Sequence, residues 1–111
     1  MTLDDHIQLA EQIANKLPDV SRNEWMRWMQ IAQTHGLRRA IKHAERLSSD
    51  ITLRPAIQRA NRLIAQAMAD QLSTLERLAP GEREVVLGYV SWWLRIKTRH
   101  ETKATRKSQE R

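Results

Sequence analysis

Apolar residues recur three or four positions apart along most of this chain, which is the spacing of one face of an α-helix. The first such stripe covers residues 3–17 and consists of Leu3, Ile7, Ala10, Ile13, Ala14 and Leu17. Pro18 follows the stripe, and because the residue before a proline avoids the helical conformation, we expect this helix to end there. No stretch alternates apolar and polar residues with the period of two that a half-buried strand shows.

A second helix is predicted between two boundary signals. Ser21 and Glu24 have the spacing of a capping box, in which each side chain bonds a free backbone N–H at the start of a helix. Gly36 suits the residue that closes a helix. The inward positions of this second helix are expected to be Trp25, Met26, Trp28, Met29 and Ala32.

Three further helices complete the predicted pattern. The third covers residues 37–48, where a basic side lies opposite an apolar side. Thr52 is the expected cap of a long fourth helix, and Pro55 is tolerated in its first turn because that N–H needs no partner. The fifth covers about residues 82–99 and is apolar over most of its circumference, which is typical of a core helix or an interface.

These patterns predict an all-α fold, a compact bundle of about five helices over residues 1–96. Residues 97–111 form a basic tail with almost nothing to bury, so we expect that tail to be flexible. A length of 111 residues is typical of one domain and allows a sizeable core. The chain has no cysteine, which excludes disulfides and thiolate chemistry.

Neither a membrane span nor an export signal is visible. No apolar run approaches the roughly 18 residues of a membrane-spanning helix. The first residues lack the basic stretch and apolar stretch of a signal peptide. We therefore expect no membrane partner and a cytoplasmic location.

Motifs for catalysis or metal binding are absent from the sequence. There is no Gly-rich phosphate loop, no HExxH helix and no nucleophile elbow, and no two of the four histidines lie one helical turn apart. Glu82 and Glu84 are two positions apart, so on a helix they face different directions. We expect no catalytic residue, no metal and no cofactor, and hence a protein that is not an enzyme.

The charge favours a polyanionic partner. The chain has 19 Lys and Arg against 13 Asp and Glu, and residues 38–62 and 95–111 hold the excess. One side of the third helix carries Arg38, Arg39, Lys42 and Arg46. Candidate extensions of this surface are Arg54, Arg59, Arg62, Arg95, Lys97 and Arg99. Clustered arginines suit phosphate contacts that do not depend on nucleotide sequence. The alternative is a solvated face, with Glu45 and Asp50 as local ion-pair partners.

The large aromatic residues are expected in the core or in an interface; they are Trp25, Trp28, Tyr89, Trp92 and Trp93. The chain has no Phe, so tryptophan has to supply the large core volume. Trp92 and Trp93 are adjacent and point about 100° apart on a helix, so if one tryptophan is exposed, we expect it to be one of this pair. An alternative role for an exposed tryptophan beside basic residues is stacking on unpaired bases.

The segment Leu78-Ala79-Pro80-Gly81-Glu82-Arg83-Glu84-Val85-Val86-Leu87-Gly88-Tyr89 resembles the closing helix of the small subunits of CRISPR effector complexes. In that family an acidic helix start runs into an apolar stretch with Leu-Gly-Tyr and then into aromatic and basic residues, here Trp92, Trp93, Arg95 and Lys97. Val90 stands where a second aromatic residue is typical.

The resemblance implies a non-catalytic helical subunit of an antiviral ribonucleoprotein. Such a subunit packs against further copies of itself and against other effector subunits. It contacts the RNA or DNA backbone of the guide–target duplex or the displaced strand, while base pairing reads the sequence.

Two other interpretations remain open. Residues 22–47 are compatible with a helix-turn-helix, as in a small DNA-binding regulator or a plasmid or phage accessory protein. The second helix of that pair lacks the Asn, Gln, Ser or Thr residues that read bases. The other interpretation is a protein-interaction bundle whose arginines meet an acidic partner.

Overall fold

The computed structural model describes residues 2–109, and it describes side chains for residues 2–96. Within that range the chain forms five helices and no strand, which confirms the all-α fold class. The helices are α1 (Leu3–Asn15), α2 (Arg22–His35), α3 (Leu37–Ser48), α4 (Pro55–Arg77) and α5 (Pro80–Gln109).

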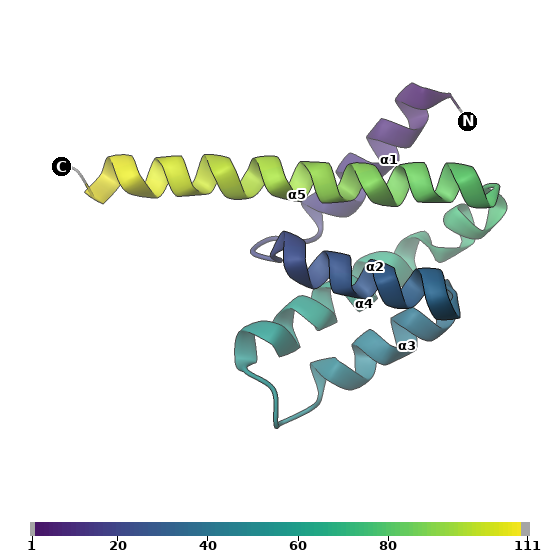
Figure 1. Ribbon diagram of the computed structural model, residues 1–111, viewed down its shortest axis with the longest axis horizontal. Coiled ribbons are helices and arrows are strands. Elements are labelled where there is room, and N and C mark those ends of the chain that lie inside the picture. The colour runs from purple at the N-terminus through teal and green to yellow at the C-terminus, as the bar shows by residue number, and fades with distance from the viewer. Residues whose placement is uncertain (1, 110–111) are drawn as a thin grey trace.

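Two helix pairs and one linking helix build the molecule (Figure 1). α1 packs against α5, and α3 packs against α4 as an antiparallel hairpin. α2 lies between the two pairs and contacts both α3 and α5. The hydrophobic core therefore runs from one pair through α2 to the other.

Two stacked tryptophans of α2 occupy the centre of this core. Trp25 and Trp28 are buried, and their ring centroids are 5.2 Å apart. The Trp25 Nε1 donates to the carbonyl oxygen of Leu87 in α5 at 3.4 Å, and the Trp28 Nε1 donates to that of Ala40 in α3 at 3.0 Å. Because a buried indole N–H needs an acceptor, these two bonds couple α2 to both helix pairs.

The starts of α1 and α2 are capped by side chains. Ser21 caps α2 as predicted, since its Oγ accepts a hydrogen bond from the Glu24 N–H at 3.1 Å. The Glu24 half of the predicted capping box does not form; the Glu24 carboxylate accepts from Arg27 Nη1 at 3.5 Å instead. α1 begins with a complete capping box that we did not predict. The Thr2 hydroxyl accepts from the Asp5 N–H, and the Asp5 carboxylate accepts from the Thr2 N–H.

The prediction that Thr52 caps α4 is wrong. The hydroxyl and the N–H of Thr52 both donate to Asp50 Oδ1, at 2.6 and 2.9 Å. These bonds lower the pKa of the Asp50 carboxyl, the hydroxyl contributing most, and they hold the chain in a turn. α4 consequently begins only at Pro55, with Arg54 as an N-cap whose side chain makes no capping bond.

Other boundaries and one core position also differ from the prediction. α1 ends at Asn15 rather than Leu17, and α5 begins at Pro80 rather than at residue 82. Met26 was expected to point inward but is 41% exposed. It lies about 100° around α2 from the buried Trp25, which puts it at the edge of the apolar face.

The bounds of α5 run through Gln109. Side chains from residue 97 onward, and residues 110–111 altogether, lie outside what the structure describes. The flexible tail over residues 97–111 and the domain boundary before it therefore stay predictions. In the described part of the chain, no helix has the length and apolar character needed to cross a bilayer.

Candidate nucleic-acid interface

α3 separates apolar and basic residues onto two sides. The apolar side is buried against its neighbours and consists of Leu37, Ala40, Ile41 and Ala44. The opposite side is exposed and carries Arg38, Arg39, Lys42 and Arg46. These four positions fall within about 100° of arc at 3.6 residues per turn. The local sequence alone therefore places four cations on one face.

Gly36 determines how this face meets α2. Its φ of 91° is a backbone conformation that L side chains rarely adopt, so another residue at this turn would be strained. The turn is a single residue between two helices, and it sets His35, the last residue of α2, beside the start of α3. A histidine that belongs to a different helix thereby becomes a neighbour of the basic face.

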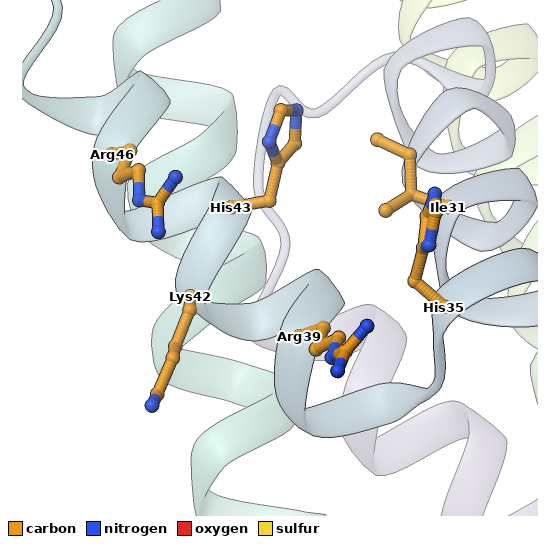
Figure 2. Close-up of a pocket in the computed structure, with 6 residues that line it drawn as sticks. All are labelled: Ile31, His35, Arg39, Lys42, His43 and Arg46. Atoms are coloured by element: carbon orange, nitrogen blue, oxygen red, sulfur yellow. The ribbon is translucent and has the colours of Figure 1, made fainter.

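A groove lies between α2 and α3, on the basic side of α3 (Figure 2). Figure 2 shows Arg39 on the side of α3 that faces His35, whereas Lys42 leaves α3 on the outer side. The full lining is Ile31 and His35 from α2 with Arg39, Lys42, His43 and Arg46 from α3. A second hollow adjoins it along α3 and is lined by Lys42, Glu45, Arg46 and Ser49.

Three cations of this groove have no acidic partner among the described side chains. Among the side chains of residues 2–96, Arg39, Lys42 and Arg46 take part in no ion pair. Glu45, which the sequence offers as a local partner, pairs with none of them. Unpaired guanidinium groups keep their planar set of donors available, and that set matches the oxygens of a phosphate.

Arg38 differs from its three neighbours. Its Nε donates to Glu76 Oε2 at 3.1 Å and its Nη2 donates to Glu76 Oε1 at 2.8 Å. The hydrogen bonds from the guanidinium to this carboxylate raise the pKa of Arg38. The pair joins the start of α3 to the end of α4, so Arg38 is engaged within the hairpin and is less available to a phosphate.

The proposed extension of the basic surface onto α4 is discontinuous. Arg59 lies 3.5 Å from Asp19 of the α1–α2 loop, measured from Nη2 to Oδ2. Arg59 and Glu76 are about 100° apart around α4, so Arg59 faces the loop while Glu76 faces α3. Arg62 and Arg54 are exposed and form no ion pair with the described side chains.

The basic residues of α5 belong to a different part of the molecule. Arg95 is exposed on α5, which packs against α1 and α2 rather than lining the groove. The side chains of Lys97 and Arg99 lie outside the described residues. The structure therefore brings together Arg39, Lys42 and Arg46, and it does not bring Arg59 or Arg95 to them.

The aromatic residues divide into a buried and a partly exposed group. Trp25 and Trp28 lie in the core, whereas Tyr89 and Trp93 are partly buried. Trp92 is 51% exposed, so the exposed tryptophan belongs to the expected pair. Its ring meets that of Trp93 edge to face, with centroids 5.1 Å apart.

His35 and Ile31 are the groove residues that sequence reasoning missed. Both belong to α2, and their proximity to α3 depends on the turn at Gly36. The sequence feature that could have identified His35 as a groove residue is its place in the last turn of α2, directly before Gly36. His43 was expected on the polar side of α3, and it is partly buried there.

The groove offers cations and hydrogen-bond donors, which is the chemistry of anion binding. In residues 2–96 no three His, Asp or Glu side chains lie close enough together to hold a metal ion. Comparisons of the chain with protein-family models, with curated proteins and with solved structures find no match. The function is therefore inferred from the residues of the groove.

Proposed function

We propose that this protein binds the backbone of nucleic acids through the groove between α2 and α3, as the small subunit of a CRISPR RNA-guided effector complex. The observation that carries phosphate binding is the set of three cations, Arg39, Lys42 and Arg46, which line one groove and have no acidic partner within residues 2–96. Each can contact a phosphate and release counterions from the nucleic acid. Such contacts position a strand but do not read its bases.

The effector-complex role rests on the resemblance of residues 78–89 to the closing helix of such subunits. In that role the chain has no catalytic task and acts in the cytoplasm. Base pairing between guide and target supplies the sequence specificity. The groove holds the guide–target duplex or the displaced strand, and α5 packs against further copies and other subunits. Flanking contacts come from cations outside the groove, namely the exposed Arg54 and Arg62 together with Lys97 and Arg99.

The first test compares adjacent arginines in the full chain. Fluorescence anisotropy with labelled single-stranded RNA, single-stranded DNA and an RNA–DNA hybrid, each in two unrelated sequences, gives the affinity as a function of salt. Arg39→Ala and Arg46→Ala should each weaken binding to every sequence and lower the salt slope by about 1. Arg38→Ala is the matched control, with the same charge change, because Glu76 already holds its guanidinium.

Equal effects of Arg38→Ala and Arg39→Ala would contradict the assignment of the groove. Binding of the wild-type chain to one duplex sequence only would favour the DNA-binding regulator. No binding near physiological salt would favour the protein-interaction bundle.

A second experiment tests the complex itself. A tagged copy is recovered from its native host, the bound nucleic acid is sequenced, and the protein partners are identified by mass. A large particle with guide RNAs that share repeat-derived ends would support the small-subunit role. Recovery of the chain alone, or with one discrete genomic DNA site, would refute it.

A further inference from the structure

The outer side of α5 carries a stripe that no other helix covers. Its members share one face because they are spaced about one helical turn apart, and they are Glu84, Val85, Gly88, Trp92 and Arg95. All five are exposed; Val85 is 41% exposed and Trp92 is 51% exposed. Exposed large apolar side chains that share one face of a helix and line one pocket are typical of an interaction surface.

A pocket lies beside this stripe, on the side that faces α1. Its lining is Ile7 from α1 together with Glu84, Val85, Gly88, Tyr89, Trp92 and Trp93 from α5. Gly88 lies in the middle of the stripe, and a Cβ added there would meet no atom within 4 Å. The backbone of α5 is therefore bare between Val85 and Trp92, so another helix can approach closely at this point.

Two copies of this stripe are complementary to each other when the two helices run antiparallel. Reversal about Tyr89 brings Val85 within one position of Trp92 and brings the acidic Glu84 within one position of the basic Arg95. Within residues 2–96 neither Glu84 nor Arg95 forms an ion pair. One chain cannot bring these two residues together, because they are 11 positions apart on a single rigid helix, about 16 Å along its axis.

We infer that a second copy of this chain docks on this stripe, with the two α5 helices antiparallel across a two-fold axis at the level of Tyr89, next to Gly88. Each Glu84 meets Arg95 of the second copy, so the symmetric contact contains two ion pairs. Each Trp92 packs over Val85 and the bare backbone of the other helix. A two-fold contact uses one patch twice, and this patch has the required complementarity in both shape and charge.

The stripe lies within residues 84–95. The contact is therefore made by side chains that the structure describes, and the α2–α3 groove of each copy is not part of it. This inference specifies the packing between copies that the proposed function includes. Its test uses the nucleic-acid-free chain, so it can fail while phosphate binding by Arg39 and Arg46 stands, and the reverse also holds.

The experiment is sedimentation equilibrium of the full chain over a range of concentrations. The wild-type chain should show a monomer–dimer equilibrium, with a mass that rises from 13.0 kDa to twice that value. Glu84→Arg and Arg95→Glu should each weaken the dimer at least about tenfold, because each places two like-charged pairs in the contact. Glu45→Arg carries the same charge change as Glu84→Arg and lies outside the stripe, so it should leave the dimer unchanged.

Mixing the two weakened variants gives the decisive measurement. One variant then has arginine at both positions and the other has glutamate at both, so the mixed dimer regains two attractive pairs. An equimolar mixture should form a heterodimer about as tightly as the wild-type homodimer forms. A wild-type chain that stays monomeric throughout, or a mixture that forms no heterodimer, would overturn the inference.

Gly88→Ala separates docking from folding. A methyl group at this position has free space in the monomer, and alanine is a better helix former than glycine. The variant should unfold at a higher temperature at concentrations where the chain is monomeric. It should nevertheless dimerise more weakly, because the Cβ holds the two helices apart. An unchanged dimer constant in Gly88→Ala would place the contact elsewhere.

Discussion

At the scale of single residues, the environment of each indole N–H distinguishes the tryptophans. The Nε1 atoms of Trp25 and Trp28 donate to backbone carbonyls of other helices. The Nε1 of Trp93 is buried and has no acceptor among the described residues. A buried donor without a partner costs free energy, so Trp93 stabilises the fold by packing alone.

This difference predicts the outcome of two matched substitutions. Trp28→Phe should lower the free energy of unfolding by about 1–3 kcal/mol, because it removes core volume and the hydrogen bond to Ala40. Trp93→Phe should lower it by less, since the N–H that it removes makes no bond. Urea unfolding followed by far-UV circular dichroism measures both. Equal losses would show that the indole hydrogen bond contributes nothing to stability.

At the scale of elements, two short carboxylate networks fix where helices begin. The N–H and the hydroxyl of Thr2 lower the pKa of the Asp5 carboxyl at the start of α1. Thr52 does the same for Asp50 in the turn before α4. A carboxyl whose pKa is lower in the folded chain stabilises the fold above its unfolded pKa, and this stabilisation is lost as the pH falls through the folded pKa.

We therefore expect an acid-dependent loss of stability that begins below about pH 4, the ordinary range of Asp. The double variant Asp5→Asn with Asp50→Asn should lose less stability between pH 4 and lower pH than the wild-type chain does. Thermal unfolding at a series of pH values measures the difference. Asp70→Asn is a suitable control, since Asp70 is an exposed carboxylate outside both turns. Parallel pH profiles for the wild type and the double variant would exclude this source of pH dependence.

At the scale of the whole molecule, α2 makes one folding unit of two helix pairs. Its tryptophans bond to α3 on one side and to α5 on the other. Among the side chains of residues 2–96, the last buried core residue is Leu94. Residues 97–111 carry six basic and two acidic residues, so their contribution is expected to be charge rather than core packing.

A chain shortened to residues 1–96 should therefore keep the thermal midpoint of the full chain to within a few degrees. Its affinity for RNA and DNA should fall at low salt, and its salt slope should be smaller, because basic residues are lost. Calorimetry and anisotropy titrations measure the two properties. A large fall in the midpoint would place part of the fold in residues 97–111.

Local periodicity and boundary residues were sufficient to predict the helices. The helical spacing of the apolar positions left Arg38, Arg39, Lys42 and Arg46 together on the opposite side of α3, and Ser21 marked the start of α2. These features depend on residues within one or two turns of each other. The sequence carries that information directly, because the helical repeat is the same in any tertiary context.

Only the tertiary structure decided which of these residues are free to contact a ligand. Arg38 and Arg39 are neighbours in the sequence, but Glu76, 38 positions away, pairs with the first and not with the second. Arg59 is paired by Asp19, 40 positions before it. Packing also exposed Trp92 rather than Trp93 and brought His35 to the groove. Ion pairing and burial depend on which helices meet, and the period of one helix contains no information about its neighbours.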